Sequence, residues 1–348
     1  MKFFLYLLQV LLYPLSLLYQ FLFFLNKTFT KKKSLPVSFV ISVGNLSIGG
    51  TGKTPFTIYL ANTINSIFPN RKIVILTRGY GGIETQEGMV VQENSNPKES
   101  GDEPLLIKRA CPFADVIVGK DRYLAFHKFC KSIVEETIII LDDGFQHHQL
   151  NRDFDFVLID LKKNIGNNFT LPIGSLREKP KSLNRANSVV FTKIEEVQKE
   201  NLLDLEKNFK KINPKLSFYK FLYIAKFIKN QNTVFSIQKI AGKKILIFTG
   251  IANPKHFQKT IQIHQPSQIH TNIFSDHHPF TKSEIKNILS KNSDYDFILC
   301  TEKDYVKIEG YKDLPLFENI YYVPIQTQID TLEEFEIEIK TAILKKKF

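Results

Sequence analysis

The most prominent feature of the hydrophobic pattern is an apolar run at the N-terminus. Residues Phe3–Leu25 contain no charged side chain. A helix of about 23 residues at about 1.5 Å each could cross a bilayer core of about 30 Å. The polar members of the run recur at helical spacing and would share one narrow stripe. The pattern predicts a membrane-attached helix, which either spans the bilayer or lies in its interface. The stripe consists of Gln9, Tyr13, Ser16 and Gln20.

A cluster of lysines follows this run. Basic residues on that side favour a cytoplasmic position for the rest of the chain, next to anionic headgroups. A signal peptide is disfavoured because the run is long and no small-residue cleavage site follows it. A buried core helix is the remaining alternative. The cluster consists of Lys27, Lys31, Lys32 and Lys33.

Beyond the lysines, short apolar runs alternate with helical stretches such as Thr54–Phe68 and Lys120–Ser132. Several runs are unbroken series of Ile, Val, Leu and Phe, which is typical of parallel strands covered on both faces. The helical stretches would then be crossovers. We therefore expect an α/β fold with a mostly parallel sheet and helices on both faces. The predicted strands are Val37–Val43, Ile73–Leu76, Asp115–Val118, Thr137–Leu141, Phe156–Asp160 and Ser188–Phe191.

The composition changes near residue 200. A polar, Lys-rich helix is predicted at Glu200–Lys215, and the aromatic stretch Leu216–Lys229 is predicted to be extended. A second, smaller α/β lobe follows, with strands at Lys244–Phe248, His270–Phe274, Phe297–Cys300 and Ile320–Pro324. The expected organisation is an N-terminal helix with its basic flank at 1–34, a core at 35–215, a hinge at 216–230 and the smaller lobe at 231–348.

The strongest motif is Gly44-Asn-Leu-Ser-Ile-Gly-Gly-Thr-Gly-Lys-Thr54, which follows the first predicted strand and precedes a helix. Its glycines let backbone N–H groups surround phosphate oxygens, and Lys53 can reach the terminal phosphates. Thr54 would bind Mg²⁺ through its hydroxyl group. Ser47 departs from the general motif, but the strand–loop–helix context supports a P-loop. The predicted nucleotide-binding residues are Gly49, Gly50, Thr51, Gly52, Lys53 and Thr54.

Two acids, Asp142 and Asp143, follow the apolar run Thr137–Leu141. They would lie where a strand ends, at the sheet edge where open α/β proteins bind ligands. A P-loop enzyme needs such a carboxylate for its metal, and either acid is a candidate Mg²⁺ ligand. The two motifs together predict a P-loop NTPase-like hydrolase or transferase and leave the acceptor open.

Composition and charge narrow the choice of partners. The formal net charge is +12, yet only seven basic residues are Arg, and all seven lie between Arg71 and Arg185. Arginine offers a bidentate fork for phosphate that lysine lacks. The three distant cysteines form no disulfide framework or CxxC metal site, which suits a reducing compartment. No aromatic–basic motif indicates nucleic acid, and no protein partner can be inferred.

Further motifs, in order from about Val43 to Lys307, resemble those of the tetraacyldisaccharide 4′-kinase family, the lipid A kinases. The resemblance implies transfer of the γ-phosphate of ATP to the 4′-hydroxyl of a tetraacylated disaccharide 1-phosphate, with Mg²⁺. It also implies a place at the cytoplasmic face of a Gram-negative inner membrane, attached through the N-terminal helix. The matching segments are Gly49–Pro55, Arg78–Gly82, Gly101–Pro104, Val118–Arg122, Leu141–His147, Gly174–Glu178, Phe248–Pro254, Phe274–Phe280 and Thr301–Asp304.

The resemblance also suggests roles for individual side chains. Asp102 is the candidate base that accepts the hydroxyl proton, and His277, preferred over His278, is its partner. Because the two lie in different lobes, their pairing would require lobe closure. Asp102 as a helix cap and His277 as a structural histidine are the alternatives.

Other residues of these motifs are assigned by their chemistry. Glu178 is the predicted third acid around the metal, His147 is expected to orient the acids, and His148 is expected to face solvent. A surface ion pair is the alternative for each predicted phosphate-binding arginine. The predicted substrate-binding residues are Arg78, Tyr80, Arg122 and Arg177.

A membrane-tethered P-loop GTPase or ATPase switch is the main competing function. Phe191-Thr-Lys-Ile-Glu195 resembles the guanine-specificity element [NT]KxD but ends in Glu195 instead of Asp. The adjacent histidines and the second lobe have no evident use in a switch. A membrane-anchored binding module without activity is disfavoured, because a full set of metal acids would serve no purpose there.

Overall fold

The chain, seen in a computed structural model, is described for residues 2–79, 88–130, 136–162, 166–194, 199–251, 253–276 and 278–346. It forms two compact units. The first contains Met1–Leu222 and Gln328–Phe348, and the second contains Tyr223–Thr327. The predicted smaller lobe 231–348 therefore includes a final segment that belongs to the first unit.

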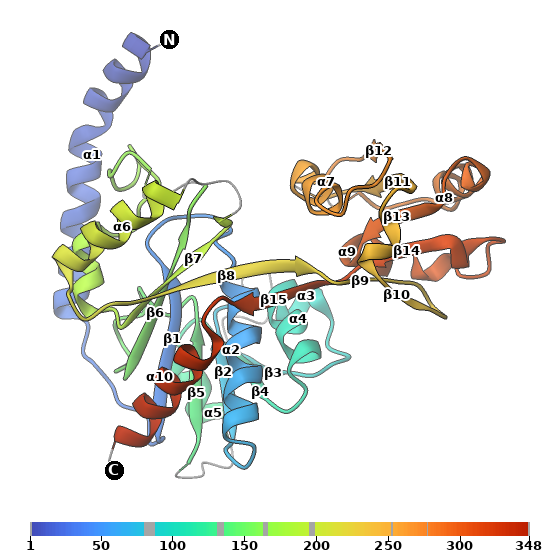
Figure 1. Cartoon of the computed structure of the whole chain (residues 1–348). Coiled ribbons are helices and arrows are strands. Elements are labelled where there is room, and N and C mark those ends of the chain that lie inside the picture. The colour runs from blue at the N-terminus through green and yellow to red at the C-terminus, as the bar shows by residue number, and fades with distance from the viewer. Residues whose placement is uncertain are drawn as a thin grey trace. The chain divides into compact units, whose positions relative to one another are not determined.

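The first unit is built on a nine-stranded sheet in the order β15-β8-β7-β6-β1-β5-β2-β4-β3 (Figure 1). The pairs from β8 to β4 are parallel, and β3 is antiparallel to β4. The predicted α/β fold with a mostly parallel sheet is confirmed. The strands are β1 (Phe39–Asn45), β2 (Ile73–Thr77), β3 (Met89–Val91), β4 (Asp115–Val118), β5 (Ile138–Asp142), β6 (Phe154–Asp160), β7 (Ser188–Thr192), β8 (Ser217–Ala225) and β15 (Ile325–Ile329).

The central strands are buried along their whole length. Every residue of β1, β2, β5, β6 and β7 is buried. This is the burial that unbroken apolar runs predict for parallel strands covered on both faces. The first unit's helices are α1 (Lys2–Phe29), α2 (Lys53–Ile67), α3 (Pro97–Ser100), α4 (Asp102–Ala110), α5 (Arg122–Phe129), α6 (Lys199–Ile212), α10 (Leu332–Lys345) and the 3₁₀ segment η2 (Pro180–Arg185).

The C-terminal helix α10 completes the first unit's core. Its buried residues Phe335, Ile339 and Ile343 recur every four positions, so they form one apolar face. The Phe335 ring lies 6.1 Å from that of Phe56 on α2. Glu338 accepts hydrogen bonds from hydroxyl groups on β7 and β8. These contacts explain why Gln328–Phe348 belongs to the first unit and not to the predicted C-terminal lobe.

The second unit has a six-stranded sheet in the order β10-β9-β14-β13-β11-β12. Its pairs from β14 to β12 are parallel, and β9 is antiparallel to both of its neighbours. Its four predicted strands are confirmed. The elements are β9 (Phe227–Lys229), β10 (Val234–Ser236), β11 (Lys244–Thr249), β12 (Gln268–Ile273), β13 (Phe297–Thr301), β14 (Ile320–Val323), α7 (Pro254–Gln262), α8 (Lys282–Leu289) and α9 (Glu302–Ile308).

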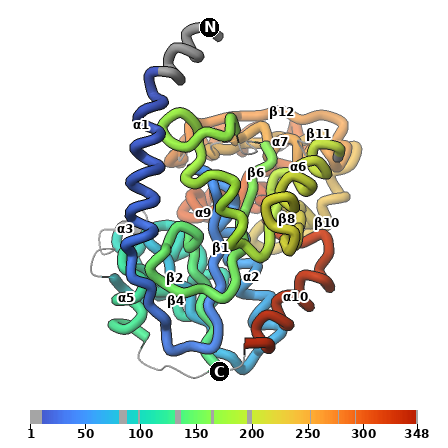
Figure 2. Tube along the Cα trace, turned by 90° about the vertical axis from the view of Figure 1, so that its left-hand side faces the viewer, coloured from blue at the N-terminus to red at the C-terminus, as the bar shows by residue number. Residues whose placement is uncertain are grey.

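The predicted N-terminal helix is present as α1 and lies along one side of the first unit (Figure 2). Part of the predicted polar stripe faces the protein: Ser16 is buried, and its Oγ lies 2.9 Å from Thr170 Oγ1. Further along the helix, the Tyr19 hydroxyl donates to the carbonyl of Arg177 at 3.1 Å. The Phe23 ring packs edge-on against His148. One face of the helix thereby contacts the segment that follows β6 and the loop that precedes it.

The opposite faces of α1 carry exposed apolar side chains. Leu18, Phe21 and Leu22 are each more than half exposed. In the part of the chain that the structure describes, no helix is both long enough and apolar enough to cross a membrane. The prediction of a helix that spans the bilayer is therefore not supported.

His148 is buried, contrary to the expectation that it faces solvent, because α1 covers it. Burial lowers the pKa of its imidazole to about 3, and the charges of Arg185 and Arg152 act in the same direction. The folded protein therefore holds this side chain in its neutral form.

We expect acid to destabilise the first unit through His148. Between pH 6.5 and about pH 3 the unfolded chain binds a proton that the folded chain does not, so stability falls as the pH drops. The His148→Phe variant should lose about 1 kcal/mol less unfolding free energy than the wild type between pH 7 and pH 5.5. Urea unfolding at both pH values measures this difference, with His127→Phe as the matched control. Equal losses in all three proteins would refute the assignment.

Candidate functional site

The predicted phosphate loop connects β1 to α2. Gly49 and Gly52 have φ values of 100° and 86°, in the left-handed region that L side chains rarely adopt. Gly52 is also the N-cap of α2, which begins at Lys53. The unpaired N–H groups and the positive end of the helix dipole therefore face the loop, as an anion site requires.

Side chains around the loop hold its shape. Asn45 donates from Nδ2 to the carbonyl of Ser47 at 2.7 Å and to Thr51 Oγ1 at 2.9 Å. Lys193, at the end of β7, donates to the carbonyl of Gly50 at 3.1 Å. Ser47 itself forms an antiparallel bridge with Leu176. The loop is extended there, which explains why a residue other than glycine fits at position 47.

Asp142 is the last residue of β5 and is 3% exposed. Its carboxylate accepts hydrogen bonds from Thr57 Oγ1 at 3.0 Å and Thr77 Oγ1 at 3.3 Å. Burial raises the pKa of this carboxyl to about 6, against the opposing effect of the Thr57 hydrogen bond. Thr57 stands one helical turn after Lys53, so α2 directs both side chains toward the same acids.

Asp143 is held by cations. Its Oδ1 lies 3.5 Å from Lys53 Nζ, and both of its oxygens lie 3.0 Å from Arg177 Nη1. Burial alone would raise the pKa of this carboxyl, but the charges of Lys53, Arg177 and Arg122 outweigh burial and lower it. Asp143 is therefore ionised at neutral pH. It lies beside Lys53, the side chain expected to bind the terminal phosphates.

Arg122 lies at the start of α5 and is only 4% exposed. Its Nη2 donates to the backbone carbonyls of Asp142 at 3.0 Å and Asp143 at 3.3 Å, and its Nη1 lies 3.3 Å from His147 Nδ1. Burial, followed by the Arg122 charge, lowers the pKa of His147 to about 3. In this structure Arg122 holds the turn of Asp142 and Asp143 through these hydrogen bonds. None of these contacts supports the prediction that Arg122 binds phosphate.

Glu178 is buried, with its Oε1 2.6 Å from Arg185 Nη2 and 3.0 Å from Gln146 Nε2. Among the described residues, no three acids, histidines or cysteines come together as a metal site. In this structure Glu178 forms an ion pair with Arg185, and its role as a third acid around the metal stays a prediction. The charge of the buried carboxylate is balanced by the guanidinium, which also lies 3.7 Å from the Phe145 ring.

Gln146 is a site residue that sequence reasoning missed. Its Nε2 donates to the carbonyl of Asn45 at 2.9 Å as well as to Glu178, and its Oε1 accepts from Arg177 at 3.3 Å. It thus connects the phosphate loop to the Arg177–Glu178 turn. Its place in the motif Leu141–His147 was the available signal, but an uncharged amide suggested no role there.

The oxygen donors at this sheet edge fit a magnesium ion. Thr54 follows Lys53 in the first turn of α2. Asp142 is the last residue of β5, and Asp143 follows it. Magnesium is typically held by one or two carboxylates together with the phosphates of its nucleotide. Two acids and one hydroxyl therefore suffice without Glu178.

The remaining predicted residues are only partly described. Asp102 is exposed and begins α4, after Gly101 at φ 87°. The charge of its neighbour Glu103 contributes to the raised pKa of Asp142, and that of Arg78 to the lowered pKa of His147. Tyr80 and His277 lie outside the described residues.

In the second unit, His278 contacts the helix that follows it, α8. Its Nε2 lies 3.1 Å from Glu284 Oε1, and its ring stacks on Phe274. Glu284 also closes the capping box of α8 with Thr281. These contacts hold the imidazole of His278 in one orientation, and the preference for His277 as the partner of Asp102 stays a prediction.

Asp304 fixes the strand end next to this turn. It is fully buried, and its Oδ2 accepts hydrogen bonds from Thr249 Oγ1 at 2.6 Å, Thr301 Oγ1 at 2.7 Å and the N–H group of Gly250 at 3.2 Å. Lys307 neutralises its charge at 3.1 Å. The backbone of Phe274 is hydrogen-bonded to Thr249, so the histidine-bearing turn starts from a rigid strand end.

Comparison with known proteins gives a consistent result. A protein of Leptospira biflexa named tetraacyldisaccharide 4′-kinase is 36% identical over 358 residues, covering 97% of this chain and 95% of that protein. Proteins of the same name from Desulfotalea psychrophila and Porphyromonas gingivalis are 35% and 32% identical and cover 84% and 91% of this chain. The matches cover 85% and 91% of the lengths of these two proteins.

A solved structure is also similar. The crystal structure of the enzyme LpxK from Aquifex aeolicus, described as an "apo" form in complex with ATP, superposes with a TM-score of 0.69 at 27% identity. The match covers 97% of this chain and 99% of that one. Residues 8–344 match the family described as tetraacyldisaccharide-1-P 4′-kinase. The chain belongs to this kinase family.

Proposed function

We propose that this chain transfers the γ-phosphate of ATP to the 4′-hydroxyl of a tetraacyldisaccharide 1-phosphate. The observation that carries the proposal is the cluster of Lys53, Asp143 and Arg177 beside a preformed phosphate loop. Family membership supplies the acceptor, and the ATP named for the Aquifex aeolicus structure supports the donor. The main alternative, a GTPase switch, has no comparable support.

Binding of the nucleotide would use groups that are already in place. The loop's N–H groups and the helix dipole attract the phosphates. Lys53 would exchange its contact with Asp143 for the terminal phosphates. Thr54, Asp142 and Asp143 would hold Mg²⁺, which when bound neutralises charge on the β- and γ-phosphates. Arg177, already within reach of Asp143, is suited to the charge that develops during transfer.

Activation of the acceptor requires a base. Asp102 is exposed at the start of α4, where a carboxylate is accessible to a substrate hydroxyl. We assign it the removal of the 4′-hydroxyl proton, with His277 as the partner that takes the proton up. Arg78 and Tyr80 are proposed to bind the sugar phosphate.

The uncovered face of α1 supports docking in the membrane interface. An acylated disaccharide cannot leave the bilayer without a large hydrophobic cost, so its kinase must work at the surface. We propose that α1 lies among the headgroups of the cytoplasmic leaflet of the inner membrane, with Leu18, Phe21 and Leu22 in the acyl layer.

Loss of the Asp143 carboxylate should abolish most transfer. Asp143→Asn removes the metal ligand and the partner of Lys53, so we expect kcat to fall about 10³-fold, the scale of a lost charged group in phosphoryl transfer. The measurement is label transfer from γ-labelled ATP to the acylated disaccharide 1-phosphate in detergent. Lys220→Gln, which removes an exposed ion pair with Asp330, is the control. Hydrolysis of GTP without lipid labelling would overturn the kinase assignment.

The base assignment predicts unequal effects at neighbouring residues. Asp102→Asn should lower kcat about 10²- to 10³-fold without raising the KM for ATP, whereas Glu103→Gln should change kcat little. Likewise His277→Gln should slow transfer, whereas His278→Gln should mainly lower the melting temperature, because it loses the Glu284 contact. Normal kcat in Asp102→Asn would exclude it as the base.

Membrane docking is tested with exposed leucines. The Leu18→Asn, Leu22→Asn double variant should shift from the membrane fraction to the soluble fraction, because two buried leucyl side chains contribute about 3–6 kcal/mol to insertion. Leu203→Asn with Leu344→Asn, on α6 and α10, is a control with similar exposure, 55% for each leucine. Equal partitioning of both double variants would contradict docking through α1.

A further inference from the structure

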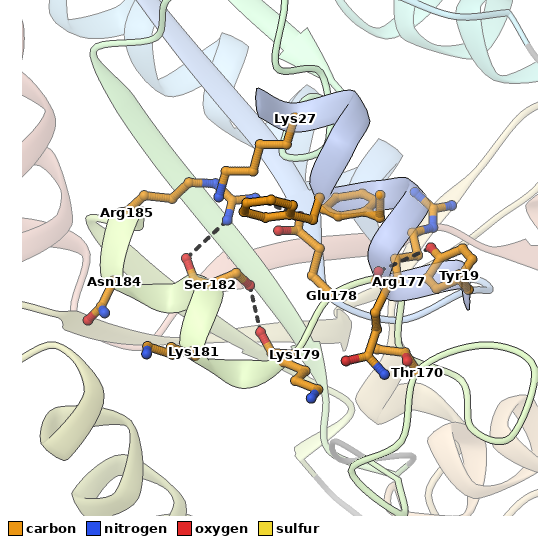
Figure 3. Close-up of a pocket in the computed structure, with 13 residues that line it drawn as sticks. Tyr19, Lys27, Thr170, Arg177, Glu178, Lys179, Lys181, Ser182, Asn184 and Arg185 are labelled. Atoms are coloured by element: carbon orange, nitrogen blue, oxygen red, sulfur yellow. Dashed lines mark hydrogen bonds and ion pairs between the residues drawn. The ribbon is translucent and has the colours of Figure 1, made fainter. Parts of the chain in front are cut away.

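A cavity of about 460 Å³ lies in the first unit between α1 and the segment that ends in η2 (Figure 3). The helix contributes Tyr19, Phe23, Phe24 and Lys27, one above another over its last turns. The facing wall runs from Thr170 through η2. No residue of the phosphate loop lines the cavity, and Arg177 is the one lining residue that the mechanism above uses.

The charges that line the cavity are unbalanced. One carboxylate, that of Glu178, faces five cations, and it is already paired with Arg185. Arg177 is likewise committed to Asp143. The remaining cations have no ion-pair partner among the residues that the structure describes. They are Lys27, Lys179 and Lys181.

Lys27 is the central member of this set. Figure 3 shows its side chain and that of Arg185 extending toward the same part of the cavity from opposite walls. Burial lowers the pKa of Lys27, and so does the charge of Arg185. Two cations that face each other across an open space provide a site for an anion, which would relieve their repulsion.

The other half of the wall is apolar. Phe23 is half-buried, and Phe24 is 60% exposed at the edge of the cavity. From there the uncovered face of α1 continues to Leu17 and Phe21. A small, fully hydrated anion would gain nothing from this surface, whereas an amphiphile would bury its chains against it.

We propose that this cavity binds the phosphate group of an anionic membrane phospholipid. The phosphate lies between Lys27 and Arg185, with Lys179 and Lys181 at the exposed rim, and the acyl chains follow the apolar face of α1. The inference rests on the interfacial position proposed above for α1. Because Arg177 contacts both the cavity and Asp143, a bound lipid would set the orientation of the catalytic edge relative to the bilayer.

The test uses the full-length protein and dihexanoyl-phosphatidylglycerol below its critical micelle concentration, followed by isothermal titration calorimetry. Below that concentration the lipid is monomeric and forms no charged membrane surface. Saturable binding would therefore indicate a discrete site on the protein. We expect saturable binding of one lipid per chain. The Lys27→Gln, Lys181→Gln double variant should weaken it about tenfold or more.

The matched control is Lys31→Gln with Lys32→Gln, which removes the same charge beside α1 but outside the cavity, and it should change the affinity less than about threefold. Phe24→Ser should weaken binding of the lipid but not of inorganic phosphate, titrated as a second probe. If phosphate binds as tightly as the lipid, the site is a free-anion site. Absence of saturable binding, or equal losses in both lysine variants, would also overturn the proposal.

The kinase assay in detergent separates this inference from the proposed function. The Lys27→Gln, Lys181→Gln variant should keep the wild-type kcat and the wild-type KM for the acylated disaccharide. A rise in that KM, in parallel with the loss of phosphatidylglycerol binding, would show that the cavity is part of the substrate site. Inactive wild-type enzyme would refute the proposed function while leaving the lipid titration interpretable.

Discussion

The carboxylate of Asp143 is the charge on which the arrangement of the site depends. It is largely buried at the end of a central strand, where an unpaired charge would be costly. Lys53 and Arg177 offset that cost, and in doing so they bring the phosphate loop and the segment after β6 to one point. The same cations are the groups that an incoming nucleotide needs. The folded site therefore holds its cations in place with an internal anion, close to where phosphate would bind.

The carboxyl of the adjacent Asp142 has a different pKa from that of Asp143, because the two side chains have different surroundings. Hydroxyl groups of Thr57 and Thr77 surround its carboxylate, which no described cation contacts at ion-pair distance. Its pKa is raised to about 6, whereas that of Asp143 is lowered. A metal ion next to both would favour ionisation of Asp142 and compensate its burial. The carboxylates of Asp142 and Asp143 therefore suit a bound metal ion, which would add the positive charge that Asp142 lacks.

A second network connects the N-terminal helix α1 to this centre. Gln146 bridges the phosphate loop to Arg177 and Glu178, and Glu178 pairs with Arg185 beside the cavity under α1. Tyr19 of α1 is hydrogen-bonded to the backbone of Arg177. The positions of α1 and of the acid pair are therefore linked through a few residues.

Local signals were sufficient to predict the elements and the chemistry of the loop. Strand positions followed from unbroken apolar runs, since only strands buried on both faces tolerate them, and Gly49 and Gly52 followed from the backbone that phosphate binding requires. Long-range pairing was not predictable. The sequence did not indicate that Glu178 pairs with Arg185, that Arg122 donates to the carbonyls of Asp142 and Asp143, or that Phe23 covers His148, because these partners are distant in the chain.

The boundary between the units shows the same limit. A change in composition near residue 216 predicted a division between two lobes, and the two units divide at Leu222. The return of the chain through β15 and α10 was not predicted, because the sequence does not show that Phe335 packs beside Phe56. The sequence by itself determined the α/β elements, the phosphate loop, the acid pair and the apolar helix, all of which are set by near neighbours. Only the tertiary structure decided which charges neutralise one another and which cations remain unpaired, because ion pairing in a buried site depends on distances between segments far apart in the chain.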